Sequence, residues 1–385
     1  MSAADARAVE FASSPKRQPT FVRGSMATLW DEAGQEYIDC GASFGVGNLG
    51  HCNPAIVEAI TRQAQELIHV GPSFGTDAKA AFVEKLLSVA PRNLNRVFLS
   101  NSGSEAVEAA IKFARAATGR PGIVAAMRGF HGRTMGALSA TWRREFREPF
   151  EPLVPGFRHV PFNDVEALAK AVDGDTAAVI LEAVQGEGGV HVASPEYLPA
   201  AREACDRAGA LLIIDEVQTG MGRTGRLFAI DRWNVEPDLL TLAKSLAGGV
   251  PIGATLATEE VERAFKGSHT STFGGNPLAC AAGTAAIEYT IREKLPERAE
   301  RLGLIGVDAI RGFDSPSVRE VRGLGLMIGV ELRGKAAPVL QALQDDGVLA
   351  IGAGSGIVRL LPPLVITDEQ WSRSLDALGR ALPHG

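Results

Sequence analysis

The chain has 385 residues, more than one hydrophobic core usually serves, so we expect two domains. Its composition, with 45% hydrophobic and 22% charged residues, is typical of a globular enzyme, and its net charge of −6 argues against a nucleic acid or a membrane surface as the partner of the whole molecule. The four cysteines show no paired spacing, and we find neither a signal-peptide core nor an apolar run of bilayer length, so we expect a cytoplasmic protein with no disulfide framework and no metal site.

The N-terminal region predicts an arm, a hairpin and a helix. Residues 1–19 are polar and contain prolines, which is typical of a loosely held arm. From Thr20, two short strands are joined by a turn at Asp31–Gly34, and a glycine-rich loop then leads to a helix over 55–67. His51 stands in this loop. It could serve catalysis, but we interpret it as a structural turn residue.

The next block combines a strand, a polar turn and a helix. Val97–Leu99 predict the strand, residues 101–104 the turn, and the apolar spacing that follows is helical until Gly119. A helix that begins at a Ser-Gly-Ser turn presents free N–H groups and its positive dipole end, which together favour a phosphate. An ordinary serine-capped helix would have the same sequence, so this block alone does not decide between the two.

Two further strands end in residues with chemical potential. Ile123–Met127 leads to Phe130, an aromatic that could stack on a flat cofactor ring or could belong to the core. Ala177–Leu181 leads to a glycine loop with Glu187, whose carboxylate could bind a substrate ammonium or pair with an arginine. Strands and helices alternate from about residue 95 to residue 260, which predicts a parallel sheet with helices on both faces.

The strongest local signal is an acid and a lysine, each at the end of a buried strand. Leu211–Ile214 leads to Asp215, and Leu239–Ala243 leads to Lys244, which glycines follow. Either residue alone would be read as a helix cap or as the first solvated position after a strand. Together they match the needs of pyridoxal phosphate, whose aldehyde forms a Schiff base with a lysine and whose ring nitrogen keeps its proton beside a carboxylate.

The same region carries a family resemblance. The run DEVQTGMGRTG from Asp215, with PDLLTLAKSLAGGVPIGA around Lys244, resembles the signature of the class III pyridoxal-phosphate aminotransferases, in the subgroup of acetylornithine and ornithine aminotransferases. The resemblance extends over roughly residues 20–380. It implies an α/β protein of fold type I, with a large domain built on a mainly parallel sheet flanked by helices, a smaller α+β domain, and a homodimer. The expected division is 1–60 for the arm and hairpin, which pack with the small domain, 61–275 for the large cofactor domain and 276–385 for the small domain.

The resemblance also implies a role for each site residue. Lys244 and Asp215 are the expected catalytic residues. Gly103 and Ser104 would bind the cofactor phosphate, together with Thr272 from the other subunit. Phe130 and Val217 would cover the two faces of the cofactor ring, and Gln218 would bind its ring oxygen. Asp215 would bind the ring nitrogen, and Lys244 the aldehyde. The substrates would be bound by Arg133 at the acceptor's α-carboxylate, by Arg359 at a carboxylate of glutamate, and by Glu187 and Ser271. Two positions depart from the family pattern: Val107 replaces an asparagine and Ala183 a proline.

The expected reaction exchanges an amino group between glutamate, which becomes 2-oxoglutarate, and the terminal aldehyde or amine of an amino acid whose α-amine is blocked. Such a site must hide Arg359 from the second substrate, and a removable ion pair with Glu187 would do so.

The sequence leaves open which group blocks the α-amine of the second substrate. The stretches VAAMRGFHGRTMG and REPFEPLV resemble the lysine-pathway enzymes, in which lysine or ornithine is linked to a small acidic carrier protein. The arginines between residues 128 and 147 would attract such a carrier, or would be surface charges paired with Glu145 and Glu148. The alternative substrate is acetylornithine. More distant alternatives are an ornithine aminotransferase, an aminomutase, or a binding protein that has lost its chemistry.

Overall fold

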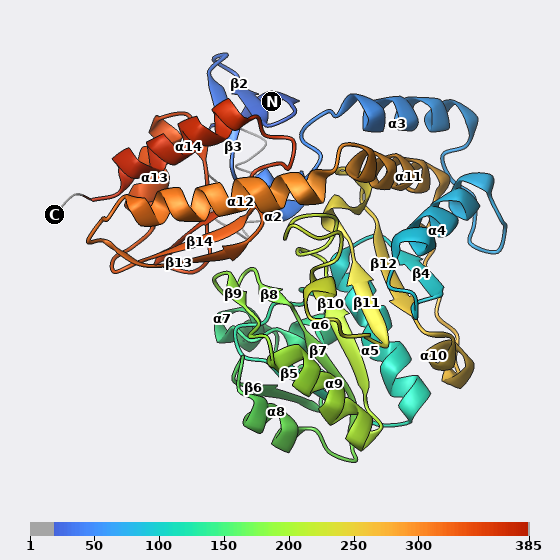
Figure 1. Ribbon diagram of the computed structural model, residues 1–385. Coiled ribbons are helices and arrows are strands. Elements are labelled where there is room, and N and C mark those ends of the chain that lie inside the picture. Colours follow the sequence, from blue (N-terminus) through green and yellow to red (C-terminus); the bar gives the residue numbers. More distant parts are fainter. Residues whose placement is uncertain (1–18, 384–385) are drawn as a thin grey trace.

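The computed structural model describes residues 19–383, so nearly all of the predicted arm lies outside the described residues. The centre of the molecule is a seven-stranded sheet (Figure 1). Its strand order is β4 (Arg96–Ser100), β12 (Gly253–Ala257), β11 (Leu239–Leu242), β10 (Leu211–Asp215), β7 (Thr176–Leu181), β5 (Gly122–Ala126) and β6 (Phe157–Val160). The sheet is mainly parallel, as predicted, but β12 runs antiparallel to both of its neighbours.

Both faces of this sheet are buried, and residues that alternate along β5 show its two core layers. In β5, Ile123 and Ala125 pack with the helix α5 (Gly103–Thr118), whereas Val124 and Ala126 pack in the layer that contains α9 (Tyr197–Ala208). This is the period-two pattern of strands that helices cover on both sides. The remaining helices of this part of the chain are α4 (Asp77–Val89), α6 (Met135–Ala140), α7 (Arg144–Arg147), α8 (Val165–Ala171) and α10 (Glu259–Ala264), with the short turns η1 (Glu148–Phe150), η2 (Ala229–Arg232) and η3 (Lys244–Ala247).

A second, antiparallel sheet forms the core of the C-terminal part. Its order is β13 (Val318–Leu324), β14 (Met327–Leu332), β17 (Ile357–Leu360) and β16 (Ile351–Gly352), and it lies beside α12 (Leu295–Gly312), α13 (Ala337–Asp345) and α14 (Asp368–Ala381) (Figure 1). Between the two sheets lies a small hairpin of β8 (Val184–Gln185) and β9 (His191–Val192), and β9 contacts β13. The turn of this hairpin carries Glu187.

The N-terminal hairpin joins the C-terminal part. β1 (Phe21–Ser25), β2 (Thr28–Asp31) and β3 (Glu36–Asp39) are antiparallel, and β3 pairs in parallel with β15 (Val348–Leu349). The predicted turn between β2 and β3 is present, because Gly34 donates its N–H to the carbonyl of Asp31. His51 lies below this sheet, where its Nε2 is 2.8 Å from the Asp39 carboxylate and its backbone bridges to Met26. The contact supports the structural interpretation of this histidine.

Three helices connect the two parts. The short α2 (Ala42–Gly45) follows β3, and α3 (Pro54–Glu66) matches the helix that was predicted over 55–67. α11 (Pro277–Arg292) packs against α3, α4 and η3, on the side of the large sheet. We therefore propose that the domain boundary, expected between residues 275 and 276, falls after α11. Within residues 19–383, no helix is both long enough and apolar enough to cross a membrane.

Candidate active site

A cavity of about 190 Å³ lies at the carboxyl ends of the parallel strands, where the crevice of an α/β sheet is expected. It brings together residues from segments far apart in the chain. Its walls are Ser102, Gly103, Ser104, Phe130, His131, Gly132, Glu182, Glu187, Asp215, Val217, Gln218 and Lys244. The strand register explains the convergence, because β10 is the centre of the sheet and its last residue, Asp215, is opposite Thr241 of β11.

Asp215 is almost completely buried, and its carboxylate is fixed by three groups. Oδ1 accepts hydrogen bonds from the backbone N–H of Val217 at 3.0 Å and from the hydroxyl of Thr241 at 3.1 Å, and Oδ2 lies 2.8 Å from Nδ1 of His131. These contacts leave the carboxylate little rotational freedom. It can therefore hold a positively charged ring nitrogen at a defined position.

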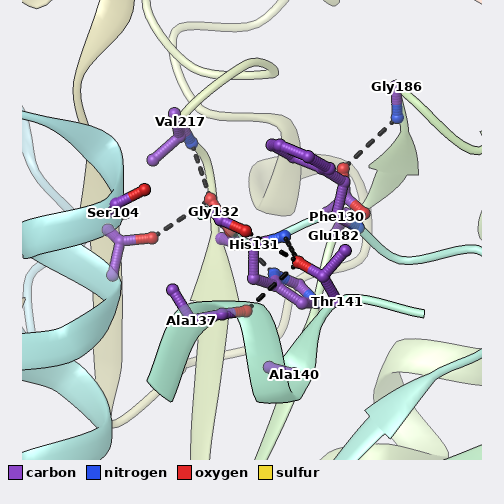
Figure 2. Close-up of polar contacts among 12 residues, drawn as sticks. Ser104, Phe130, His131, Gly132, Ala137, Ala140, Thr141, Glu182, Gly186 and Val217 are labelled. Carbon is purple, nitrogen blue, oxygen red and sulfur yellow. Dashed lines mark hydrogen bonds and ion pairs between the residues drawn. The ribbon is translucent and has the colours of Figure 1, made fainter. Parts of the chain in front are cut away.

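His131 is the side chain that lies against the carboxylate of Asp215. Burial opposes a charged imidazole, but the hydrogen bond to Asp215 and the charges of Asp215 and Glu182 outweigh it, so the pKa of His131 is raised above its ordinary value. Its ring is further held because its backbone N–H donates to the Thr141 hydroxyl (Figure 2). The sequence analysis assigned His131 no role; its position directly after Phe130 was the available signal.

Glu182 is a second buried acid that the sequence did not single out. It follows β7 at the same edge of the sheet, and it accepts hydrogen bonds from the N–H of Phe130 at 2.9 Å and of Gly186 at 3.3 Å (Figure 2). Burial raises its pKa to about 7, and the neighbouring Asp215 adds to this effect. Glu182 thus ties the aromatic wall of the cavity to the turn that carries Glu187.

The helix α5 begins at one end of the cavity. Ser102 caps it by accepting the N–H of Glu105, so the N–H groups of Gly103 and Ser104 belong to the open first turn. The Ser104 hydroxyl accepts the N–H of Arg133 at 3.0 Å. A Cβ atom at Gly103 would lie 2.7 Å from Cγ1 of Val217, so only glycine allows the helix end and Val217 to line the cavity together.

Lys244 lies two residues after the end of β11 and begins the turn η3 with a left-handed backbone (φ 47°). Its side chain is only partly accessible to solvent, and burial of the amine disfavours the charged ammonium form. Burial lowers the pKa of Lys244 to about 8; the negative charge of Glu187 opposes this shift, and the positive charge of Arg359 adds to it. About a tenth of this amine is therefore neutral, and nucleophilic, at pH 7, far more than for an ordinary lysine.

The ion pair expected between Glu187 and Arg359 is present. Nη2 of Arg359 is 2.7 Å from Oε1 of Glu187, and Nη1 donates to Oε1 of Gln218 at 3.3 Å. Arg359 has no exposed surface, and its guanidinium lies 5.8 Å from the ring centre of Phe44, a half-exposed side chain on a strained loop. Among the described residues, Nε of Arg359 has no hydrogen-bond partner. The guanidinium can therefore accept a second carboxylate.

The predicted substrate residues Arg133 and Ser271, and Thr272, which was predicted to bind the cofactor phosphate of the other subunit, lie at or beyond the rim. Arg133 is exposed, and its guanidinium stacks 3.8 Å above the ring of Phe146 and 5.4 Å from that of Phe130. Ser271 and Thr272 line a separate hollow of about 340 Å³, in which Ser271 accepts a hydrogen bond from Asn101. Within one chain, these two residues are not brought into the cavity of Lys244.

A larger hollow of about 660 Å³ adjoins the turn of Glu187. Its walls include Arg128, Trp142, Arg143, Arg144, Arg147, Gly188, His191 and residues 353–357. Arg143 donates to the backbone carbonyl of Glu187 at 3.2 Å, so this hollow and the cavity share a wall. Two of the local pairs considered from the sequence occur: Arg144 with Glu148 at 2.9 Å, and Arg143 with Glu145 at 3.6 Å.

Comparisons with known proteins agree on one family. The family model described as "Aminotransferase class-III" matches residues 12–382. An acetylornithine aminotransferase of Methanopyrus kandleri is 51% identical, with 94% of each chain covered. A [LysW]-aminoadipate semialdehyde transaminase of Deinococcus radiodurans is 48% identical, with 95% of this chain and 86% of the relative covered. In structure, the ornithine aminotransferase of Toxoplasma gondii superposes with a TM-score of 0.94 at 36% identity, covering 98% of this chain and 93% of the other.

Proposed function

The chain belongs to the class III aminotransferases, which depend on pyridoxal phosphate. From this premise we propose that it transfers an amino group between glutamate, which becomes 2-oxoglutarate, and the terminal aldehyde of an amino acid whose α-amine is blocked, which becomes the terminal amine. The observation that carries this proposal is the ion pair of Glu187 with the buried Arg359 beside Lys244. A binding protein without chemistry would need no nucleophilic lysine, and an aminomutase would need no separate site for glutamate.

The cavity fits the cofactor in charge and in shape. When bound, pyridoxal phosphate supplies the aldehyde and the electron-withdrawing ring through which an amino group passes between substrates. The first turn of α5 suits its phosphate, Asp215 its ring nitrogen, and Val217 and Phe130 its two faces. Gln218 would donate to its ring oxygen. The close approach of Gly103 to Val217 leaves room for a flat group and for no additional side chain.

Each catalytic residue has a separate task. Lys244 would hold the cofactor covalently, and its amine, once released by a substrate amine, moves the proton at the substrate carbon that bears the reacting nitrogen. Asp215 would keep the adjoining ring nitrogen protonated, and His131, whose pKa is raised above its ordinary value, lies against the Asp215 carboxylate and holds it in place. Glu182 holds Phe130 in place by accepting its backbone N–H.

One pocket must accept two different substrates. Glutamate brings a carboxylate, which would replace Glu187 on the guanidinium of Arg359. The second substrate brings a terminal amine on an aliphatic chain, for which an uncovered buried arginine would be unfavourable. With Glu187 in place, the charge of Arg359 is neutralised. The exchange of one carboxylate for another therefore adapts the site to each substrate in turn.

For the blocked substrate, we propose lysine or ornithine linked to a small acidic carrier protein. The Deinococcus relative is named for such a substrate, and the arginine hollow adjoins the turn of Glu187, where a carrier would lie while its substrate arm enters the cavity. The arginines of this hollow form a positively charged patch on a chain whose net charge is negative, and such a patch would attract an acidic partner. Acetylornithine is the second candidate, because the relative from Methanopyrus carries that name and the local acidic partners neutralise part of the hollow.

A comparison of the two substrates across ionic strength separates these candidates. We expect kcat/KM for the carrier-linked amine to fall as salt rises, and to fall about tenfold or more at low salt in the double variant Arg143→Glu/Arg144→Glu, because steered association depends on opposite charges. The acetylated amine should not respond to salt, and Arg144→Glu alone, which leaves the hydrogen bond of Arg143 to the carbonyl of Glu187 intact, should lower kcat/KM for the carrier-linked amine but not for the acetylated amine. The control Arg207→Glu/Arg263→Glu reverses two exposed arginines on α9 and α10, outside the hollow. If the acetylated compound is the better substrate and the Arg143→Glu/Arg144→Glu variant behaves like the control, acetylornithine is the substrate.

We also propose that the active unit is a homodimer. Thr272 is exposed and lies in a hollow separate from Lys244, so within one chain it does not reach the first turn of α5 from inside the cavity. The family resemblance assigns it to the cofactor phosphate of the other subunit. An arrangement in which each subunit completes the partner's site accounts for its position.

A further inference from the structure

Three residues on adjacent strands of the small sheet form one row beneath the turn of Glu187. Arg322 of β13 is directly opposite Gly329 of β14, and Gly329 is directly opposite Arg359 of β17. Residues that face each other across antiparallel strands point to the same side of a sheet. The two arginine side chains therefore rise on the same face, with a gap at Gly329 between them.

The turn of the β8–β9 hairpin sits in this gap. A Cβ atom at Gly329 would lie 2.9 Å from Cβ of Val190 and 3.2 Å from the carbonyl oxygen of Gly189. Val190 is fully buried with a left-handed backbone (φ 59°) and packs in a small apolar cluster with Met327 and Leu361. Glycine at position 329 is thus what allows the turn to approach both arginines.

The two arginines hold different parts of the turn. Arg359 pairs with the side chain of Glu187, whereas Arg322 donates from Nε to the backbone carbonyl of Gly189 at 2.9 Å. Arg322 is itself held, because Nη1 lies 2.6 Å from Glu331 and 2.7 Å from Glu320 and only 9% of the residue is exposed. A substrate carboxylate can replace Glu187 on Arg359. No group of either substrate competes with the carbonyl of Gly189 for Arg322.

The turn is fastened from the large domain as well. Arg128 lies 3.1 Å from Nε2 of His191, the first residue of β9, and Gly186 donates its N–H to Glu182. Burial, followed by the charges of Arg322 and Arg128, lowers the pKa of His191 to about 4, so at neutral pH the ring is uncharged and Nε2 accepts from Arg128. The backbone on both sides of Glu187 is therefore fixed while its side chain remains 23% exposed.

We propose that Arg322 is a positioning residue for substrate selection: by clamping the backbone of Gly189, it holds Glu187 within reach of Arg359, so that the change between substrates is a side-chain movement and not a movement of the loop. This inference rests on the proposed exchange of Glu187 for glutamate. Without the clamp, Glu187 would cover Arg359 for a smaller fraction of the time. The site would then lose efficiency toward the amine substrate more than toward glutamate.

The test measures kcat/KM separately for glutamate and for the blocked ω-amine in the holoenzyme, and takes the ratio of amine to glutamate. Arg322→Met should lower this ratio roughly five- to tenfold, the effect of losing a charge-assisted hydrogen bond, mainly through a higher KM for the amine. Arg322→Lys keeps the charge but cannot bind Gly189 and both carboxylates at once, so we expect a smaller fall, of about twofold or more. The matched control is Arg319→Met, which removes an exposed arginine of the same strand that also pairs with Glu331 but does not touch the turn.

A double-mutant cycle with Glu187→Ala then locates the effect. Glu187→Ala alone should lower the ratio, and adding Arg322→Met should lower it no further, because the clamped side chain is gone. If Glu187→Ala lowers the ratio but neither Arg322 variant does, or if Arg319→Met lowers it equally, the role of Arg322 is refuted while the proposed exchange stands. An unchanged ratio in Glu187→Ala would refute the exchange and the clamp together. Should Arg322→Met not fold, Arg322→Lys decides the question by itself.

Discussion

Lys244 combines a largely enclosed position with four charged neighbours, Glu187, Arg359, Asp215 and Glu182. Burial favours the neutral amine, Glu187 and Asp215 favour the ammonium, and Arg359 opposes it. Burial prevails, so the pKa falls from the ordinary range of lysine to about 8. The lysine is thereby prepared as a nucleophile by its surroundings before any substrate is present.

This preparation can be measured without any turnover. In cofactor-free protein whose lysines carry ¹³C-labelled methyl groups, one NMR signal should titrate near pH 8, and Lys244→Ala should remove it. Glu187→Ala should shift that titration to lower pH, because it removes a negative charge that stabilises the ammonium. If the signal lost in Lys244→Ala titrates above pH 10, like an exposed lysine, the environment described for the amine is wrong.

The sequence predicted the residues at strand ends well, but not the side chains that form hydrogen bonds with them. Asp215, Lys244, Phe130 and Glu187 each follow an apolar run, so their places at one edge of the sheet could be predicted from periodicity. The hydrogen bond of His131 to Asp215 could not, because it joins positions 84 residues apart and depends on the rotation of both side chains. Thr241 was equally hidden, since it lies within an apolar strand.

At the scale of elements, the start of α5 is the most constrained part of the site. The sequence predicted a turn over residues 101–104 followed by a helix that Gly119 ends; the helix begins earlier, at Gly103, with Ser102 as its cap, and it ends at Gly119 as predicted. What the sequence did not contain was the distance to the neighbouring segment. Gly103 is required because Val217, which follows β10, approaches its backbone.

The variant Gly103→Ala tests this packing. The added methyl group would meet Val217 at 2.7 Å, so Val217 must move toward the cofactor position. We expect cofactor affinity to fall about tenfold or more and folding to lose about 1–3 kcal/mol, as is typical of overpacking. The double variant Gly103→Ala/Val217→Ala should recover much of the affinity. Undiminished cofactor binding in Gly103→Ala, measured by equilibrium dialysis, would show that Val217 does not line the ring site.

At the scale of the whole molecule, both expected sheets are present, but their meeting point could not be foreseen. A small α+β domain was implied by resemblance, and Arg359 was assigned to glutamate on the same ground. The row formed by Arg322, Gly329 and Arg359 depends on the register of three strands, which the sequence does not specify. The antiparallel β12 was missed for a related reason: its buried apolar run fits either direction.

The two domains contribute unlike parts of one reaction. In the proposed reaction, the large sheet would supply the nucleophile, the acid and the phosphate end of the site, and the small sheet would supply the arginine that distinguishes the substrates. The central claim is that this combined site removes an amino group from glutamate at Lys244 before the second substrate enters.

A single-turnover experiment tests that claim directly. The loaded protein is mixed with glutamate alone, and 2-oxoglutarate is measured against the number of active sites. We predict one equivalent per site, followed by no further product until an aldehyde acceptor is added, and no product at all from Lys244→Ala. If the wild-type protein forms no 2-oxoglutarate from glutamate alone, or if Lys244→Ala forms it as fast as the wild type, the proposed reaction at this site is contradicted.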